Sequence, residues 1–352
     1  MLGRRRVDVL PRQRHDPGSG DADRRSAGLG SHRPHRHGRH SPGNGPLLKI
    51  RVTRLACGGM VLGCSLHHVV GDMHSFMLLM RSWSAFVDGT APPEVTIVED
   101  RDAYLDRMLP PLDSGQPSYR MLDADDAAAM FAELQRAMQT TEVVQLHFGE
   151  TEVSRMREKF SAAQGRSLTV NDVLCAHLVD TLHQIEGGTD TRFLNLVVNI
   201  RPRLGIPPSV IGNTIAIVEV PGGPGARPEL LAGTVRDTVE NLSRSPLNLR
   251  ADRAYLEACD ESQLHRVMFR GLDPAHRPLL VSNWCSFDLY DLTFDGRPPV
   301  LSCPVPGPTC FEVPWVGVLT KAFGNSGYLW TLGVPAQFAD RLRACSASVQ
   351  AR

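Results

Sequence analysis

The strongest constraint on the fold lies in residues 60–89, which read MVLGCSLHHVVGDMHSFMLLMRSWSAFVDG. Residues 60–66 form a nearly continuous apolar run, which is typical of a strand buried on both faces. After a polar loop, apolar residues recur at the spacing of one helix face: Phe76, Met80, Trp83 and Val87. Ser75 can cap the start of this helix and Gly89 can end it. The segment therefore predicts a strand, a short loop and an amphipathic helix, the unit from which α/β folds are built.

The loop of this unit carries the chain's clearest candidate for chemistry. His67 and His68 are adjacent, and Asp72 follows His68 by four positions. The loop lies just past the carboxyl end of the predicted strand, where α/β folds tend to place ligand sites. An imidazole with an ordinary pKa of about 6.5 can take a proton from a hydroxyl or an amine near neutral pH. The carboxylate can orient the imidazole or hold the loop, and the spacing leaves both roles open.

The rest of the chain alternates between strand and helix patterns without internal repeats. A capping arrangement of Thr169 and Asp172 opens a helix over residues 167–185. Strands are predicted at 47–55, 143–148, 192–200 and 213–220, and further helices at 102–108, 124–138, 151–164, 229–242 and 251–269. From Leu279 onward the pattern is strand-like and broken by Pro and Gly. Two α/β domains are the expected architecture.

The domain boundaries follow from changes in composition. Residues 1–45 are rich in Arg, His, Gly, Pro and Ser and show no hydrophobic periodicity, so we expect a disordered tail. Its His-rich part at 31–40 could suggest metal or nucleic-acid binding, but a solvated tail is the interpretation we adopt. We expect an N-terminal domain over 46–110, a crossover over 111–142 and a C-terminal domain over 143–352.

Composition and missing motifs exclude several classes of function. The formal net charge is zero, so no overall field steers the chain toward nucleic acid or an anionic membrane. Apolar stretches are too short to span a bilayer, and the eight Cys form neither a zinc motif nor a disulfide framework. The chain lacks a phosphate-binding P-loop, a G-x-S-x-G elbow and an H-E-x-x-H motif. We expect a cytoplasmic protein with no metal, no nucleic acid and no membrane partner.

Three segments, in order, resemble one known family. HHVVGD (67–72) resembles the His-His-x-x-x-Asp signature of the chloramphenicol acetyltransferase-like superfamily, which includes nonribosomal condensation domains and the BAHD acyltransferases. VNIRPRL (198–204), followed by IGN (211–213), resembles the Arg-x-Arg and Gly-Asn stretch of the BAHD branch. VSNWCSFDLYDLTFDGRPPVL (281–301) resembles the BAHD segment that usually ends in Asp-Phe-Gly-Trp-Gly. The similarity runs from about Pro46 to about Leu342.

The resemblance implies a fold and a mechanism. It implies two α/β domains that face each other across a channel, the first truncated here, with 281–301 packing back toward the channel. It implies a monomeric enzyme of specialised metabolism that uses acyl-CoA as co-substrate, binds no cofactor, and acylates the hydroxyl or amine of a small molecule. His68 corresponds to the family's general base, and no acyl-enzyme forms. Asp72 and His67 correspond to residues that support the catalytic loop.

The chain departs from the family pattern at two motifs. Met73 stands where the family usually has Gly, and Asp-Phe-Gly-Trp-Gly has become Thr293-Phe294-Asp295-Gly296. In the family the first Asp of that motif commonly pairs with an Arg of the Arg-x-Arg stretch. Asp295 is a candidate substitute partner for Arg201 or Arg203, or alternatively a turn residue in Phe-Asp-Gly.

Two other functions stay open at this stage. One is a condensation-like domain that takes its acyl group from a carrier protein. The other is a degenerate, non-catalytic remnant that still binds a ligand or a partner. The sequence specifies neither the acyl group nor the acceptor.

Overall fold

A computed structural model describes residues 46–109, 115–187, 192–220, 227–242, 248–304 and 313–350. Contacts divide the chain into residues 1–46 and 47–352, and the fold described below belongs to the second unit. The tail expected over residues 1–45 lies outside the described residues.

A six-stranded mixed sheet forms the centre of the second unit, in the order β4-β10-β9-β8-β5-β6. The middle strands β5, β8 and β9 run parallel, whereas β6, β10 and β4 join by antiparallel pairing. The strand bounds are β4 Thr141–Gly149, β5 Leu194–Asn199, β6 Ile215–Val220, β8 Leu279–Asn283, β9 Val316–Lys321 and β10 Gly327–Pro335. The carboxyl ends of the three parallel strands meet at one edge of this sheet, which is where an α/β fold concentrates its loops.

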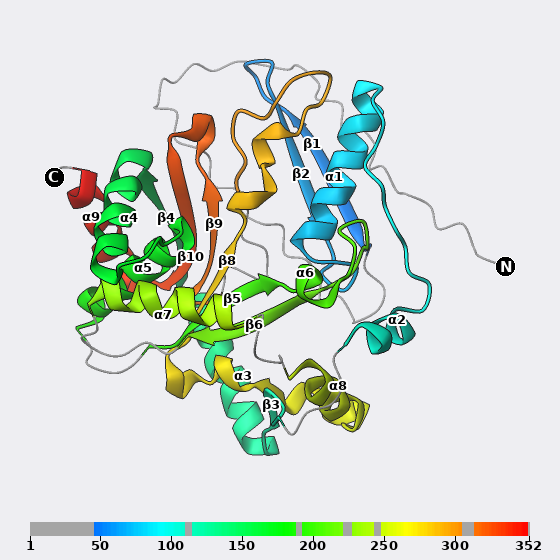
Figure 1. The fold of residues 1–352 in the computed structure, drawn as a ribbon, viewed down its shortest axis with the longest axis vertical. Coiled ribbons are helices and arrows are strands. Elements are labelled where there is room, and N and C mark those ends of the chain that lie inside the picture. Colours follow the sequence, from blue (N-terminus) through cyan, green and yellow to red (C-terminus); the bar gives the residue numbers. More distant parts are fainter. Residues whose placement is uncertain are drawn as a thin grey trace, which may run out of the picture. The chain divides into compact units, whose positions relative to one another are not determined.

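Four helices gather at one side of this sheet (Figure 1). They are α4 Glu150–Gln164, α5 Val170–Glu186, α7 Pro228–Asn241 and α9 Ala336–Gln350. The α5 helix begins as predicted, because the Thr169 side chain accepts from the Asp172 N–H and the Asp172 side chain accepts in return from the Thr169 N–H. Leu174, Leu178 and Leu182 of α5 are fully buried in the core against the sheet.

The first two strands form a separate two-stranded antiparallel sheet beside α1 (Figure 1). These elements are β1 Leu48–Arg54, β2 Met60–Leu66 and α1 Met73–Asp88. The expectation that residues 60–66 are buried on both faces was wrong, since Met60 is 68% exposed and Val61 is 50% exposed. An apolar cavity of about 250 Å³ is lined by Leu48, Ile50, Cys64, Leu79, Met80 and Trp83. Within β2 only Leu62, Cys64 and Leu66 are partly buried, and a continuous apolar pattern cannot distinguish such a strand from one buried on both faces.

Smaller elements complete the described fold. They are α2 Arg101–Met108, β3 Tyr119–Met121, α3 Ala124–Gln139, α6 Arg201–Leu204, α8 Leu249–Glu257 and β7 Val267–Phe269, with short 3-10 turns between residues 261 and 291. The single helix expected over 251–269 was wrong, because α8 ends at Glu257 and the chain continues into a 3-10 turn and β7. The strand-like pattern predicted from Leu279 onward did not include the helix α9.

The division at residues 110 and 142 stays a prediction. The expected crossover contains β3 and α3, and β3 pairs with β7 from the C-terminal part of the chain. None of the helices described has both the length and the hydropathy that a bilayer crossing requires.

Candidate active site

The His-His loop joins β2 to α1 and is held at its start by backbone bonds. The His67 N–H donates to the Leu47 carbonyl at 2.7 Å, and the Val70 N–H donates to the His67 carbonyl at 2.9 Å. The His67 ring also takes part, since its Nδ1 accepts from the Val69 N–H at 3.2 Å. His67 and His68 are both exposed. The loop is therefore a turn with fixed hydrogen bonds that presents the two imidazoles at the surface of the unit.

Asp72 ends the loop and begins the helix. Its Oδ1 accepts from the Ser75 N–H at 3.0 Å, so Asp72 is the N-cap of α1. From the sequence we predicted Ser75 as the residue that caps the start of this helix, and that prediction was wrong. Gly71, just before the cap, is buried, and a Cβ there would lie 2.5 Å from the Ser75 Cβ. Only glycine lets the loop approach the helix this closely.

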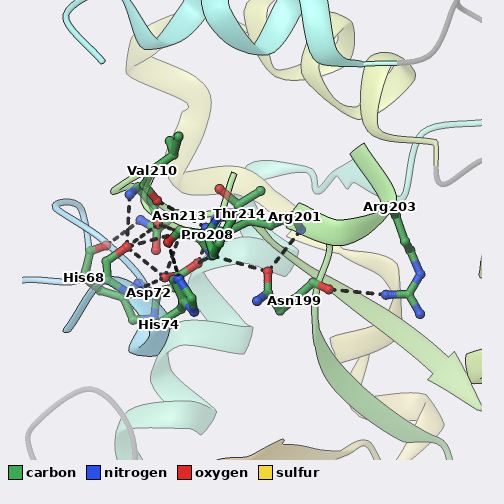
Figure 2. Close-up of polar contacts among 12 residues, drawn as sticks. His68, Asp72, His74, Asn199, Arg201, Arg203, Pro208, Val210, Asn213 and Thr214 are labelled. Carbon is green, nitrogen blue, oxygen red and sulfur yellow. Dashed lines mark hydrogen bonds and ion pairs between the residues drawn. The ribbon is translucent and has the colours of Figure 1, made fainter. Parts of the chain in front are cut away.

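The Asp72 carboxylate forms a buried ion pair with Arg201 (Figure 2). The Arg201 Nη1 donates to Asp72 Oδ2 at 2.7 Å, and Nη2 donates to Oδ1 at 3.2 Å. The Asp72 side chain is 3% exposed and the Arg201 side chain is 2% exposed. The Thr214 N–H also donates, to Oδ2 at 2.9 Å. The pair joins the start of α1 to the segment that follows β5, across 129 positions of the sequence.

These donors control the protonation of Asp72. Burial alone raises the pKa of its carboxyl group, because a charge is less stable away from water. The Arg201 guanidinium and the N–H groups of Thr214 and Ser75 together outweigh burial and hold the pKa below its ordinary value. Asp72 is therefore an anion at neutral pH, and its oxygens are occupied by these donors.

Ser75 links the ion pair to the loop around Gly212. Its buried Oγ accepts from the Gly212 N–H at 3.0 Å and from Arg201 Nη2 at 3.2 Å. Its own proton has two acceptors within reach, the Gly212 carbonyl at 2.9 Å and Asp72 Oδ1 at 3.0 Å. Gly212 has φ +153°, a conformation that favours glycine. A hydroxyl with several partners in a buried cluster is costly to remove, and sequence reasoning missed this role of Ser75.

Arg201 occupies its position because it lies two residues past the last residue of the parallel strand β5. Its remaining N–H groups donate to the Val210 carbonyl at 3.3 Å, to the Gly212 carbonyl at 2.7 Å and to Asn199 Oδ1 at 3.3 Å. A guanidinium has five donors in a rigid fork, so it can bind the carboxylate and the surrounding carbonyls at the same time. Arg201 therefore fixes the 199–214 segment and the start of α1 as one unit.

Two further contacts join the His-His loop and α1 to this segment (Figure 2). The Asn213 amide donates to the backbone carbonyl of His68 at 2.5 Å. The His74 Nε2 lies 2.7 Å from the Pro208 carbonyl oxygen. Neither residue was named as a site residue from the sequence, although Asn213 lies in the Ile-Gly-Asn stretch that resembles the family.

The structure does not bring Asp295 to either candidate arginine. Arg203 points away from Asp72 (Figure 2) and donates to the backbone carbonyls of Asn199 and Val239, each at 3.3 Å. Among the described residues, the ion pairs within 4.0 Å include none between Asp295 and Arg201 or Arg203. The expected pairing was wrong because Arg201 is already paired with Asp72. Asp295 has φ 59° and lies in a turn next to Gly296, which matches the alternative interpretation.

Residues 293–296, where the family usually has Asp-Phe-Gly-Trp-Gly, instead bind the last turns of α1. The Thr293 hydroxyl donates to Asp88 Oδ2 at 2.5 Å, and the Gly296 N–H donates to Oδ1 at 3.0 Å. These two donors lower the pKa of Asp88. The Trp83 and Phe294 rings meet edge to face, with centroids 5.3 Å apart. Thr293 thus keeps a carboxylate partner, but the carboxylate comes from α1.

In the described ranges, no group of three or more His, Cys, Asp or Glu side chains is placed to hold a metal ion. The polar residues of this site are instead arranged around one buried carboxylate and one exposed imidazole loop. Such an arrangement can present a base to a bound substrate on a backbone held by several hydrogen bonds.

A family of transferases and several curated acyltransferases are similar to this chain. A family model described as the Transferase family matches residues 32–310. Agmatine coumaroyltransferase-1 of Hordeum vulgare is 23% identical over 270 residues, which cover 73% of this chain and 61% of the relative. Putrescine hydroxycinnamoyltransferase of Oryza sativa subsp. japonica is 23% identical over 305 residues, which cover 75% and 63%. The chain thus spans less than two-thirds of the length of these relatives.

Solved structures of low identity share the fold. Vinorine synthase superposes with a TM-score of 0.60 and 18% identity, covering 88% of this chain and 66% of the other. TRI101 of F. graminearum, complexed with coenzyme A and T-2 mycotoxin, superposes with a TM-score of 0.66 and 16% identity, covering 87% and 70%. The acyltransferase-type α/β fold expected from the motifs is confirmed. Because the family model matches most of the chain, this protein belongs to the Transferase family, the BAHD acyltransferases that its three motifs resemble.

Proposed function

We propose that the chain transfers an acyl group from acyl-CoA to the hydroxyl or amine of a small molecule, with His68 as the general base. The observation that carries the proposal is the exposed His68 on a loop fixed by the buried Asp72–Arg201 pair. Family membership supports the reaction class. The names of the relatives support the acceptor class, since agmatine and putrescine are amines. The solved complex of TRI101 with coenzyme A supports a CoA donor.

The proposed reaction needs one base and no covalent intermediate on the protein. The His68 imidazole accepts the proton of the acceptor hydroxyl or amine as that atom attacks the thioester carbonyl. The tetrahedral intermediate then collapses, the C–S bond breaks, and the imidazolium returns its proton to the leaving thiolate of CoA. The proton taken from the acceptor ends on the CoA thiol, and no step changes an oxidation state. The proposed steps therefore require no metal or bound cofactor.

In this proposal Asp72 holds the loop and does not orient the imidazole. Its two oxygens accept from Arg201, Ser75 and Thr214. A carboxylate that is 3% exposed and bonded in this way is suited to fixing a backbone turn. His67 supports the same turn through its ring and its backbone. The proposal retains the sequence-based expectations of a monomeric, cytoplasmic enzyme of specialised metabolism.

The test is acceptor-dependent release of CoA by the purified chain. Coumaroyl-CoA and acetyl-CoA are offered as donors, each with agmatine, putrescine and a simple alcohol as acceptors. Cys57 and Cys303 are exposed and would themselves react with a thiol reagent, so CoA and the acylated product are followed by chromatography and mass spectrometry. We expect product with at least one pair and its loss in His68→Ala.

Two results would contradict the proposal. One is the absence of both product and measurable coenzyme A binding across the panel, which would favour a non-catalytic remnant. The other is product only from an acyl group carried on a phosphopantetheinyl carrier protein, which would favour a condensation-like domain.

A further inference from the structure

Asn213 lies between two residues that are bonded to the buried cluster. On one side the Gly212 N–H donates to Ser75 Oγ at 3.0 Å, and on the other the Thr214 N–H donates to Asp72 Oδ2 at 2.9 Å. The backbone at Asn213 is therefore fixed on both sides, while its side chain is exposed. That side chain reaches back across 145 positions and donates to the backbone carbonyl of His68 at 2.5 Å.

We propose that Asn213 is a positioning residue that sets the orientation of His68, an inference that rests on the proposed function. The loop is held at its start by the bond between the His67 N–H and the Leu47 carbonyl, and at its end by Asp72. His68 lies between these two points on an exposed turn. A donor on its own carbonyl fixes the peptide plane that follows the residue, and with it the direction of the Cα–Cβ bond. Through this hydrogen bond, Asn213 links the residue that bears the imidazole to the buried cluster (Figure 2).

The expected effect is on the rate of the chemical step. A displacement of about 1 Å in a catalytic group can lower a rate by about 100-fold, because reaction requires near-contact geometry. Loss of the Asn213 bond should allow a smaller displacement, so we expect kcat to fall by about 10- to 100-fold. The KM for acyl-CoA should change by less than about twofold, because Asn213 acts through His68 and not on the substrate.

The experiment compares Asn213→Leu with a matched control, Asn248→Leu. Leu has nearly the shape of Asn and cannot donate. Asn248 also uses its amide to donate to a distant backbone carbonyl, that of Gln116 at 2.7 Å, across 132 positions. The control therefore loses a bond of the same kind outside the His-His loop. A purely structural role predicts similar losses of melting temperature and unchanged kcat in both variants.

A second variant at the same position is needed in case Asn213→Leu does not fold. Asn213→Asp keeps the shape of the side chain and replaces its donor by an acceptor, so it should lower kcat as Asn213→Leu does. A fall in kcat in both variants, with Asn248→Leu unchanged, supports the inference. A kcat within about twofold of wild type in a folded Asn213 variant overturns it. A rise in KM at constant kcat also overturns it, because Asn213 would then contact substrate.

A double-mutant cycle with His68→Ala shows whether Asn213 acts through the imidazole. If it does, Asn213→Leu lowers the rate of the wild type but leaves the residual rate of His68→Ala unchanged. An equal fold-loss in both backgrounds overturns the positioning role. The cycle also separates the two claims. Near-wild-type turnover by His68→Ala ends the proposed function itself, whereas a slow His68→Ala beside a fully active Asn213→Leu ends only this inference.

Discussion

Two buried arginine–carboxylate clusters lie at opposite ends of strand β5. Just past its carboxyl end, Arg201 pairs with Asp72. Just before its amino end, Arg192 pairs with Glu186, which also binds Arg277. Both carboxylates are nearly inaccessible, with 3% and 7% of their side chains exposed. Each cluster is thus built on one carboxylate and one nearly inaccessible guanidinium, and the Glu186 cluster has Arg277 as a second, partly exposed partner.

The surroundings indicate different roles. The Glu186 cluster joins the last turn of α5 to the residues before β5 and β8, and the Arg192 guanidinium lies 4.5 Å from the Trp315 ring centroid. The Asp72 cluster joins two loops, one of which carries His68. Breaking either cluster should destabilise the fold, but only the cluster at the carboxyl end should affect catalysis. We therefore expect the Arg192–Glu186 pair to stabilise the fold at one end of β5 and the Arg201–Asp72 pair to support the proposed active site at the other.

The largest expected effect is that of Asp72→Ala compared with Glu186→Ala. Each change leaves a buried guanidinium without its carboxylate partner, which typically costs about 3–5 kcal/mol of unfolding free energy, and Glu186→Ala also unpairs the partly exposed Arg277. We expect comparable losses of stability in urea unfolding for the two variants. Turnover measured at a temperature where both are folded should fall in Asp72→Ala and stay near wild type in Glu186→Ala. Equal losses of kcat would remove the distinction between the clusters.

Asp72→Asn is a milder version of the same change. It keeps the shape of the side chain but loses the charge and one acceptor oxygen, so the loss of unfolding free energy should be about 1–3 kcal/mol. Activity should fall chiefly because the loop loosens, and it should therefore fall in step with the melting temperature. A variant of wild-type stability that is inactive would show that Asp72 takes a direct part in the reaction.

The contribution of Asp72 should depend on pH in a defined direction. Its pKa in the folded protein lies below the ordinary value of 3.8. A lowered pKa means that the ionised carboxyl group stabilises the fold at pH values above 3.8, and that this stabilisation is lost as pH falls through the folded-state pKa. The difference in unfolding free energy between wild type and Asp72→Asn should be constant from pH 7 to about pH 5 and shrink below about pH 4. Urea midpoints over this range measure it, and a difference that persists unchanged to pH 2 contradicts the account.

The smallest expected effect is at the half-buried contact between α1 and residues 293–296. Thr293→Val removes the hydroxyl that donates to Asp88 Oδ2 and keeps the shape of the side chain. The Gly296 N–H remains as a donor to the same carboxylate. We expect the melting temperature to fall by no more than about 3 °C, with kcat unchanged. A loss as large as that of Asp72→Asn would show that the difference between a half-buried and a fully buried carboxylate does not separate the two contacts.

Local patterns predicted most of the described helices and strands. The capping box of Thr169 and Asp172 and the left-handed Gly89 fix helix ends through bonds a few residues apart, so the sequence alone reveals them. The failures have equally local causes. The apolar run at 60–66 has the composition of a strand buried on both faces, and only its isolation in a two-stranded sheet exposes it. The polar 3-10 turn after α8 interrupts a pattern that resembled one helix.

The site was predicted less completely, because its bonds are long-range. The loop with His68 and Asp72 was recognised from the sequence, and Arg201 was named as a structural residue. The partner of Arg201 was assigned wrongly, since no local pattern links residues 129 positions apart. The roles of Ser75 and Asn213 also depend on tertiary contacts. A polar side chain in a sequence gives its donors and acceptors but not the groups that they reach.

The role of His68 as general base is tested most directly by kcat for His68→Ala measured beside His67→Ala. The two imidazoles are adjacent and exposed, so the substitutions are closely matched in composition and accessibility. We predict that His68→Ala keeps its melting temperature and loses about 10²- to 10⁴-fold in kcat, the usual contribution of a general base. His67→Ala should lose stability through its bond to Val69 and retain most of its turnover. A folded His68→Ala with near-wild-type kcat would contradict the mechanism.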